Sequence, residues 1–183
     1  ESVPEIQGKM IEGLQTWQWA HEGTFDFPRW QNHPRGPMPE KWMRYDGHHL
    51  NGNQVILSYS INTRKIMEMP AKAGGFGAII QTLRVEPGTK PLKLAVAKLG
   101  NVNERRGFIG FKAPTVKLER TAKGNIGKMA VTLIQQEDKP HQFTAAAALG
   151  QTEGMSWDFD DQGRTVLTIP ASKKSRVFQY LPA

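Results

Sequence analysis

Hydrophobic and polar residues alternate along much of the chain after Asn53. Apolar side chains take every second position between residues 55 and 61, and the same period recurs at 79–85 and 92–96. A period of two is typical of a β-strand with one buried face. The same reasoning predicts further strands at 64–69, 116–119, 129–134, 155–159, 165–169 and 176–181.

Turn-forming residues separate these segments. Leu50-Asn51-Gly52-Asn53 has the composition of a tight hairpin turn, and so does Asp160-Asp161-Gln162-Gly163. The alanine-rich stretch at 143–149 suits either a helix or a closely packed strand, and its composition does not decide between them. No long amphipathic helix is indicated elsewhere.

About ten short strands at regular spacing indicate an all-β fold, an antiparallel two-sheet sandwich of jelly-roll-like type. Residues 1–52 lack the period and are rich in Trp, Pro and turn formers, so we interpret them as an irregular N-terminal wrap. Residues 53–183 would form the sandwich core. With 183 residues and no linker-like stretch, the chain is expected to be a single domain.

Composition narrows the chemistry. The chain has no cysteine, which excludes disulfides, thiolate metal sites and covalent haem attachment within it. We therefore expect no covalently bound cofactor. No apolar run reaches the ~18 residues that a membrane-spanning helix needs, so no membrane span is expected.

Positive charge is concentrated in one region. The net charge is +7, and residues 90–128 contain ten Lys or Arg against two Glu. A basic surface of this kind attracts acidic partners, although a solvated sheet face would have the same composition. The candidate residues for binding a partner or an anion are Lys93, Arg105, Arg106, Lys112, Lys117 and Arg120.

Four of the five tryptophans lie in the first quarter of the chain, namely Trp17, Trp19, Trp30 and Trp42. Aromatic faces stack on sugar rings and also anchor protein interfaces. The alternative is that these side chains cap the core of the sandwich. They are candidates for glycan or interface contacts on the first interpretation.

Metal sites have weaker support. His48 and His49 are adjacent, and neighbouring residues of a strand point to opposite faces, so the two cannot easily hold one metal together. They remain the candidate metal residues. Asp158 and Asp160 begin a stretch that matches the first half of a calcium loop, but Ile169 stands where a bidentate Glu is required, which favours a plain hairpin.

Nucleic-acid binding is not expected. Arg106-Gly107-Phe108-Ile109-Gly110-Phe111 resembles an RNA-binding strand motif, but its spacing is off by one residue and the two helices of that fold are missing.

One segment resembles a known family. Residues 36–61 (GPMPEKWMRYDGHHLNGNQVILSYSI) are similar to a stretch of large exported proteins of the Planctomycetes–Verrucomicrobia type, with the pattern GPLP-x-x-W-x-(K/R)-Y-x-G-x-Y-x-x-G-(D/N)-x-V-x-LSYTV. Residues 83–94, 165–170 and 176–178 look like later strands of the same domain. His48 and His49 depart from the pattern, which has an apolar residue and Tyr at these positions.

In such proteins this β domain precedes a propeller resembling sugar dehydrogenases and a cytochrome domain with CxxCH. The resemblance implies a periplasmic or secreted location and an electron-transfer setting, with haem in a partner chain or another domain. We expect a non-catalytic module or subunit that docks a cytochrome or dehydrogenase-like chain, accessory to an oxidoreductase. The alternative is a glycan-binding sandwich for anionic polysaccharide; a hydrolase or lyase acting on such a polymer has no supporting motif.

Overall fold

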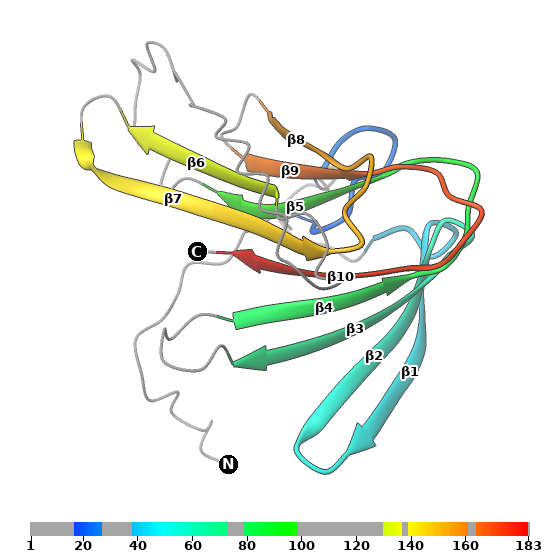
Figure 1. The fold of residues 1–183 in the computed structure, drawn as a ribbon. Helices are drawn as coiled ribbons and strands as arrows, with labels where there is room; N and C mark the ends of the chain where they lie inside the picture. The colour runs from blue at the N-terminus through cyan, green and yellow to red at the C-terminus, as the bar shows by residue number, and fades with distance from the viewer. Residues whose placement is uncertain are drawn as a thin grey trace, which may run out of the picture.

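The described strands form two antiparallel sheets (Figure 1). The computed structural model describes residues 17–26, 38–72, 79–98, 130–136, 139–160 and 164–182. These residues contain ten strands and no helix, as the alternating pattern predicts. The strands are β1 (Met43–Asn51), β2 (Gln54–Ile61), β3 (Arg64–Lys72), β4 (Ile79–Val85), β5 (Leu92–Lys98), β6 (Ala130–Gln136), β7 (Lys139–Gly150), β8 (Ser156–Phe159), β9 (Arg164–Ile169) and β10 (Arg176–Pro182).

The larger sheet has seven strands in the order β1-β2-β3-β4-β10-β7-β6. Its first four strands are consecutive in sequence, and β10 then inserts between β4 and β7. The smaller sheet has the order β5-β9-β8. Residues 18–20 extend this sheet beyond β5, because the Ala20 N–H donates to Lys93 O (3.0 Å) and the Ala95 N–H donates to Gln18 O (2.8 Å).

The core lies between the two sheets. The larger sheet contributes inward side chains such as Ile66 and Phe178, and the smaller sheet contributes Leu94 and Leu167, each at most 1% exposed. Strand β5 contacts β10 and β7, so the smaller sheet lies over that part of the larger one. Strands β1 and β2 are at the opposite side of the larger sheet, and their turn projects away from the smaller sheet (Figure 1).

One part of the domain interpretation is wrong. Residues 43–51 belong to strand β1 and are not part of an irregular wrap. This strand shows no alternation in sequence because none of its nine residues is buried; seven are exposed and two, Met43 and Gly47, are half-buried. An edge strand that buries neither face has no reason to alternate hydrophobic with polar residues.

The alanine-rich stretch is a strand. Ala147 pairs with Val131 of β6 on one side and with Leu181 of β10 on the other. Ala146 and Ala148 are both buried, at 1% and 0% exposure. The packing of these small residues between two strands therefore decides a choice that local propensity leaves open.

Candidate functional site

The β1–β2 hairpin presents an apolar face to solvent. Leu50 is 70% exposed, Tyr45 57% and Val55 37%. Leu50 pairs directly with Val55, and Tyr45 pairs directly with Tyr59, whose ring is in the core. Because side chains two residues apart share a face, these three exposed side chains lie on the core-facing side of the sheet, beyond the area that the smaller sheet covers. We call Tyr45, Leu50 and Val55 the hairpin patch.

Strand β1 is also an edge of the larger sheet. Among the described strands, β1 has a hydrogen-bonded neighbour only in β2. A β-bulge interrupts their register between Tyr45 and Gly47, and Gly47 has φ +120°, a conformation that a residue with a side chain adopts only under strain. The patch therefore borders a row of backbone groups that can pair with another strand.

The two histidines of β1 lie on opposite faces. His48 pairs with Leu57 and His49 with Ile56, so their side chains diverge as the sequence predicts. The ring nitrogen Nδ1 of His48 is 2.9 Å from the Tyr45 hydroxyl, which joins His48 to the hairpin patch. No group of three metal-binding side chains occurs in the part of the chain that the structure describes, and the metal role of these residues stays a prediction.

The other face of the hairpin is charged. Arg44 donates to Asp46 at 2.8 Å, and the Ser60 hydroxyl donates to the same carboxylate at 2.9 Å. The hydrogen bond from Ser60 lowers the pKa of Asp46, and Arg44 adds to this effect by its hydrogen bond and its charge. The two faces of the hairpin thus differ, one apolar and one polar.

A buried chain of polar groups lies beneath the inner end of the hairpin. The indole N–H of Trp19 donates to the Tyr59 hydroxyl at 3.1 Å, and that hydroxyl donates to Glu68 Oε2 at 2.6 Å. Glu68 is only 7% exposed. Burial raises the pKa of Glu68, and the hydrogen bond from Tyr59 partly opposes the shift. Burial likewise raises the pKa of Tyr59, and the neighbouring Glu68 raises it further.

A second polar group continues across the sheet. Gln18 donates to Gln81 Oε1 at 3.3 Å and also to the hydroxyl of Tyr180, which itself donates to Gln81. Burial raises the pKa of Tyr180, and the charge of Glu68 adds to it. These contacts join the N-terminal segment to β4 and β10, so they bind the two sheets together as well as satisfying the buried polar atoms.

The candidate tryptophans are mostly interior. Trp17 and Trp19 are 6% and 3% exposed, so their faces are not available on the surface for a glycan or a partner. They occupy the core, which is the alternative role that the sequence leaves open. Trp42 is half-buried and packs against the core, with His21 against its ring at 5.1 Å. Trp30 lies outside the described residues.

Of the six candidate basic residues, the structure describes one. Lys93 is exposed on β5 between buried Leu92 and Leu94, as the alternation predicts. The next residue on that face, Ala95, is buried, because Ala20 and Phe25 pack against it. The other five, Arg105, Arg106, Lys112, Lys117 and Arg120, lie outside the described residues, as does the strand expected at 116–119.

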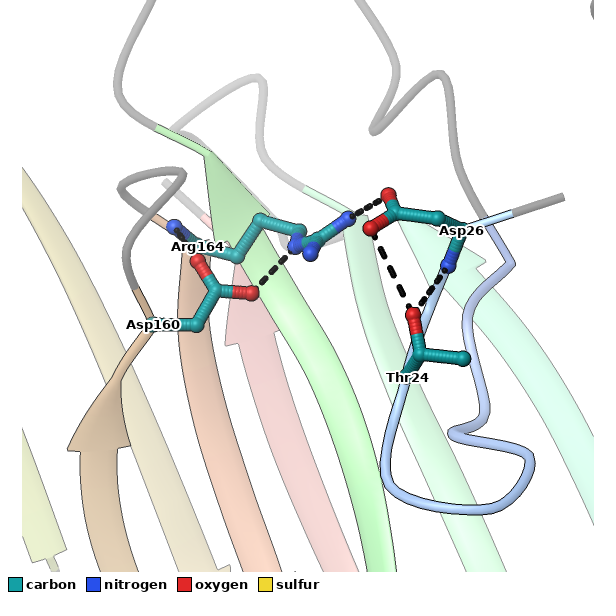
Figure 2. A network of polar contacts seen from close by, with 4 residues as sticks. All are labelled: Thr24, Asp26, Asp160 and Arg164. Carbon is teal, nitrogen blue, oxygen red and sulfur yellow. Dashed lines mark hydrogen bonds and ion pairs between the residues drawn. The ribbon is translucent and has the colours of Figure 1, made fainter.

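The calcium-like stretch is part of a hairpin that an arginine closes. Strands β8 and β9 pair on either side of it, as expected. Figure 2 shows Arg164, 3% exposed, between two carboxylates: its Nε donates to Asp160 and its Nη1 donates to Asp26 at 2.8 Å. The guanidinium also lies 5.1 Å from the centre of the Phe25 ring. Burial lowers the pKa of Arg164, but the hydrogen bonds that it donates to Asp26 and Asp160, with the charges of both carboxylates, raise it overall.

Sequence reasoning missed the residues that the structure makes most unusual. Arg64 and Glu68 are charged yet buried, at 2% and 7% exposure. They flank Ile66 at alternate positions of β3, so all three point inward. Arg64 and Glu68 occupy positions that face the same side as the apolar residues of the neighbouring strands. This alignment can be recognised only once the strand register is known.

Comparison with known families gives one match. A family described as a domain of unknown function (DUF6797) matches residues 1–68, which include the whole of β1 and β2 and therefore the hairpin patch. No curated protein matches the chain. No helix in the described residues is long and apolar enough to cross a membrane.

Proposed function

We propose that the chain is a non-catalytic docking module of an exported redox assembly, accessory to an oxidoreductase, and that a partner chain binds at the β1–β2 hairpin. The observation that carries this proposal is the hairpin patch beside an edge of β1 with which no described strand pairs. Leu50, Tyr45 and Val55 are exposed together on one face, at 70%, 57% and 37%.

The physical reason is that such an edge favours association. An unpaired strand offers backbone donors and acceptors to an incoming strand, and exposed apolar side chains next to it add burial on contact. Burying apolar surface contributes roughly 25 cal/mol per Å². Leu50 and Tyr45 are large enough to act as anchors, and the Tyr45 hydroxyl keeps a polar contact with His48 at the rim.

The charge of the chain indicates the kind of partner. A net charge of +7 favours an acidic chain and accelerates its approach. We propose an extended, apolar segment flanked by Asp or Glu, belonging to a cytochrome or dehydrogenase-like chain that carries the haem. The redox class of this partner comes from the resemblance of residues 36–61 to exported haem-linked proteins.

The experiment compares partner capture by matched variants. The 183-residue chain would be immobilised and exposed to the exported protein fraction of its source organism, and the retained chains measured by visible spectrum and mass. Leu50→Lys tests the patch. Val177→Lys is the control, because Val177 is also an exposed apolar strand residue, at 45%, but lies on β10 away from the hairpin.

We expect the wild type and Val177→Lys to retain a haem-containing or oxidoreductase chain in fixed ratio. Leu50→Lys should retain at least tenfold less of that chain. Retained material without haem or oxidoreductase would refute the redox partner. Equal retention by Leu50→Lys would refute the hairpin as the docking surface. Retardation by anionic polysaccharide, measured by affinity electrophoresis, together with no protein partner, would favour glycan binding instead.

A further inference from the structure

Two loops meet at one end of the sandwich. The connection from β4 to β5 contacts the connection from β9 to β10 through Gly88 and Ser172, which exchange backbone hydrogen bonds at 2.9 and 3.0 Å. These loops close the space between the two sheets at the end where β3 begins. A buried arginine, Arg64, occupies this space.

Arg64 is held by neutral groups. Its Nε donates to Glu86 O at 3.0 Å, and its Nη1 lies 3.3 Å from both Lys90 O and Pro170 O. A Cβ added to Gly88 would lie 2.4 Å from the Cγ and Cδ atoms of Arg64, so the loop backbone packs directly on the arginine stem. The side chain is thus fixed in place, yet none of its acceptors carries a charge.

A second arginine lies nearby. Arg176 is the first residue of β10 and is two residues before Phe178, so it points to the same inner face. Its Nη1 donates to the backbone carbonyl of Glu153. Val85 of β4 pairs with Ile66 of β3 on one side and with Arg176 on the other, so Arg176 lies two strands away from β3 on the same inner face. Burial lowers the pKa of Arg64, and the positive charge of Arg176 lowers it further.

Each arginine has a buried donor that no acceptor meets. Arg64 Nη2 and Arg176 Nε are both closed to solvent and have no hydrogen-bond partner among the described residues. No described carboxylate forms an ion pair with either side chain. A buried cation without a counter-charge is costly, and an unmet buried donor adds to that cost, so the two arginines favour a negatively charged acceptor that the described residues do not supply.

We propose that Arg64 and Arg176 together bind a small oxyanion, whose oxygens accept hydrogen bonds from Arg64 Nη2 and Arg176 Nε. Guanidinium groups match the geometry of phosphate, sulfate and carboxylate oxygens. Arg176 is only half-buried and Arg64 is buried, so the anion would reach the pair from the side of Arg176. Such an anion would also remove the repulsion between the two cations and link the loops that join the sheets.

The test is the melting temperature of the intact 183-residue chain as a function of inorganic phosphate, with sulfate and acetate as separate arms and sodium chloride keeping ionic strength constant. Binding to the folded state raises the melting temperature with the logarithm of anion concentration, by roughly 5–10 °C at a hundredfold excess over the dissociation constant. The anion whose logarithmic rise begins at the lowest concentration identifies the preferred oxyanion. A rise that is only linear in concentration would come from general salt exclusion and would count against the site.

Arg176→Gln removes the charge of one of the two donors and is expected to abolish the logarithmic rise. Arg176→Lys keeps the charge but not the fork, and about tenfold weaker binding is expected. Arg84→Gln is the control, because Arg84 is an exposed arginine on neighbouring β4 that pairs with Glu86 at 2.7 Å. A rise that is only linear in concentration in all three anions would overturn the proposal, since internal water would then satisfy the donors. An equal rise in Arg176→Gln would overturn it as well.

The oxyanion site is independent of the docking surface. Leu50→Lys, which tests the hairpin, is expected to leave the phosphate response unchanged, because Leu50 lies at the turn of the β1–β2 hairpin and takes no part in the loops around Arg64. Either proposal can therefore fail without the other.

Discussion

At the scale of single residues, Glu68 is the group whose charge matters most to the interior. It lies in the middle of β3, is 7% exposed and accepts a 2.6 Å hydrogen bond from Tyr59. A carboxylate at such a site loses hydration that one hydrogen bond only partly replaces. Burial therefore raises its pKa above the ordinary value of 4.5.

This shift predicts how stability depends on pH. The pKa of Glu68 is higher in the folded chain than in the unfolded chain. The contribution of its protonated form to the free energy of unfolding is therefore fully present below pH 4.5, and it is lost as the pH rises through the folded-state pKa. Glu68→Gln keeps an acceptor for Tyr59 but cannot ionise. We expect the free energy of unfolding of Glu68→Gln, relative to wild type, to increase with pH over this window, measured by urea denaturation at a series of pH values.

Glu153→Gln is the matched control, since Glu153 is an exposed glutamate. A difference in the free energy of unfolding between wild type and Glu68→Gln that stays constant at every pH would contradict the expectation. It would mean that Glu68 has the same proton affinity in the folded and unfolded chains.

Residues of this kind show where sequence reasoning stops. The exposure of Lys93 and the divergence of His48 and His49 follow from the alternation of a strand, and both could be predicted. The burial of Glu68 could not, because it depends on Tyr59 of β2 and Trp19 of a distant segment meeting it between the sheets. A local pattern contains no information about partners 40 residues away along the chain.

At the scale of elements, an ion pair helps to fasten the N-terminal segment 17–26 to the smaller sheet. It pairs with β5 through Gln18 and Ala20, and it is tied to β9 by the ion pair of Asp26 with buried Arg164 (Figure 2). The carboxylate of Asp26 is 45% exposed, so solvent screens part of this interaction.

Asp26→Asn is expected to loosen this segment. The arginine keeps Asp160 but loses one of its two counter-charges, at a cost of about 1 kcal/mol. Hydrogen exchange should accelerate at the amide of Ala20, which donates to Lys93 O. Asp46→Asn breaks a surface ion pair on β1 in the same way and is the control, for which the Ala20 amide should exchange at the wild-type rate. Unchanged exchange in Asp26→Asn would show that the ion pair does not hold the segment.

Elements with one buried face were predictable, and those without one were not. The period-two segments at 55–61 and 79–85 correspond to β2 and β4, because each buries one face on the core. Strand β1 gave no signal, since its side chains stay exposed on both faces, and the same exposure makes it a docking candidate. The feature that hides this strand from pattern analysis is thus the one that points to its function.

At the scale of the whole molecule, strand order sets the functional surfaces. Strand β10 inserts between β4 and β7, which places Arg176 on the same sheet face as Arg64, more than a hundred residues earlier in the chain. Composition and periodicity indicated two antiparallel sheets, but which strands are neighbours depends on long-range pairing that they do not encode. The oxyanion site therefore exists only in the assembled fold.

The shared core predicts that both sheets unfold together. Leu94 of the smaller sheet and Ile66 of the larger one are both fully buried in the same cluster, and Trp19 packs among them. Leu94→Ala should cost about 2–5 kcal/mol, lowering the melting temperature by roughly 2–4 °C per kcal/mol. If the chain is one cooperative domain, the unfolding transitions followed by tryptophan fluorescence and by far-ultraviolet circular dichroism should shift to lower temperature by the same amount.

Val177→Ala is the control, because Val177 is at an exposed strand position. This substitution should change the free energy of unfolding by no more than about 0.5 kcal/mol with either probe. Separate transitions for the two probes would show that the sheets fold as independent units, and the contact between the loops at Gly88 and Ser172 would then be too weak to couple them.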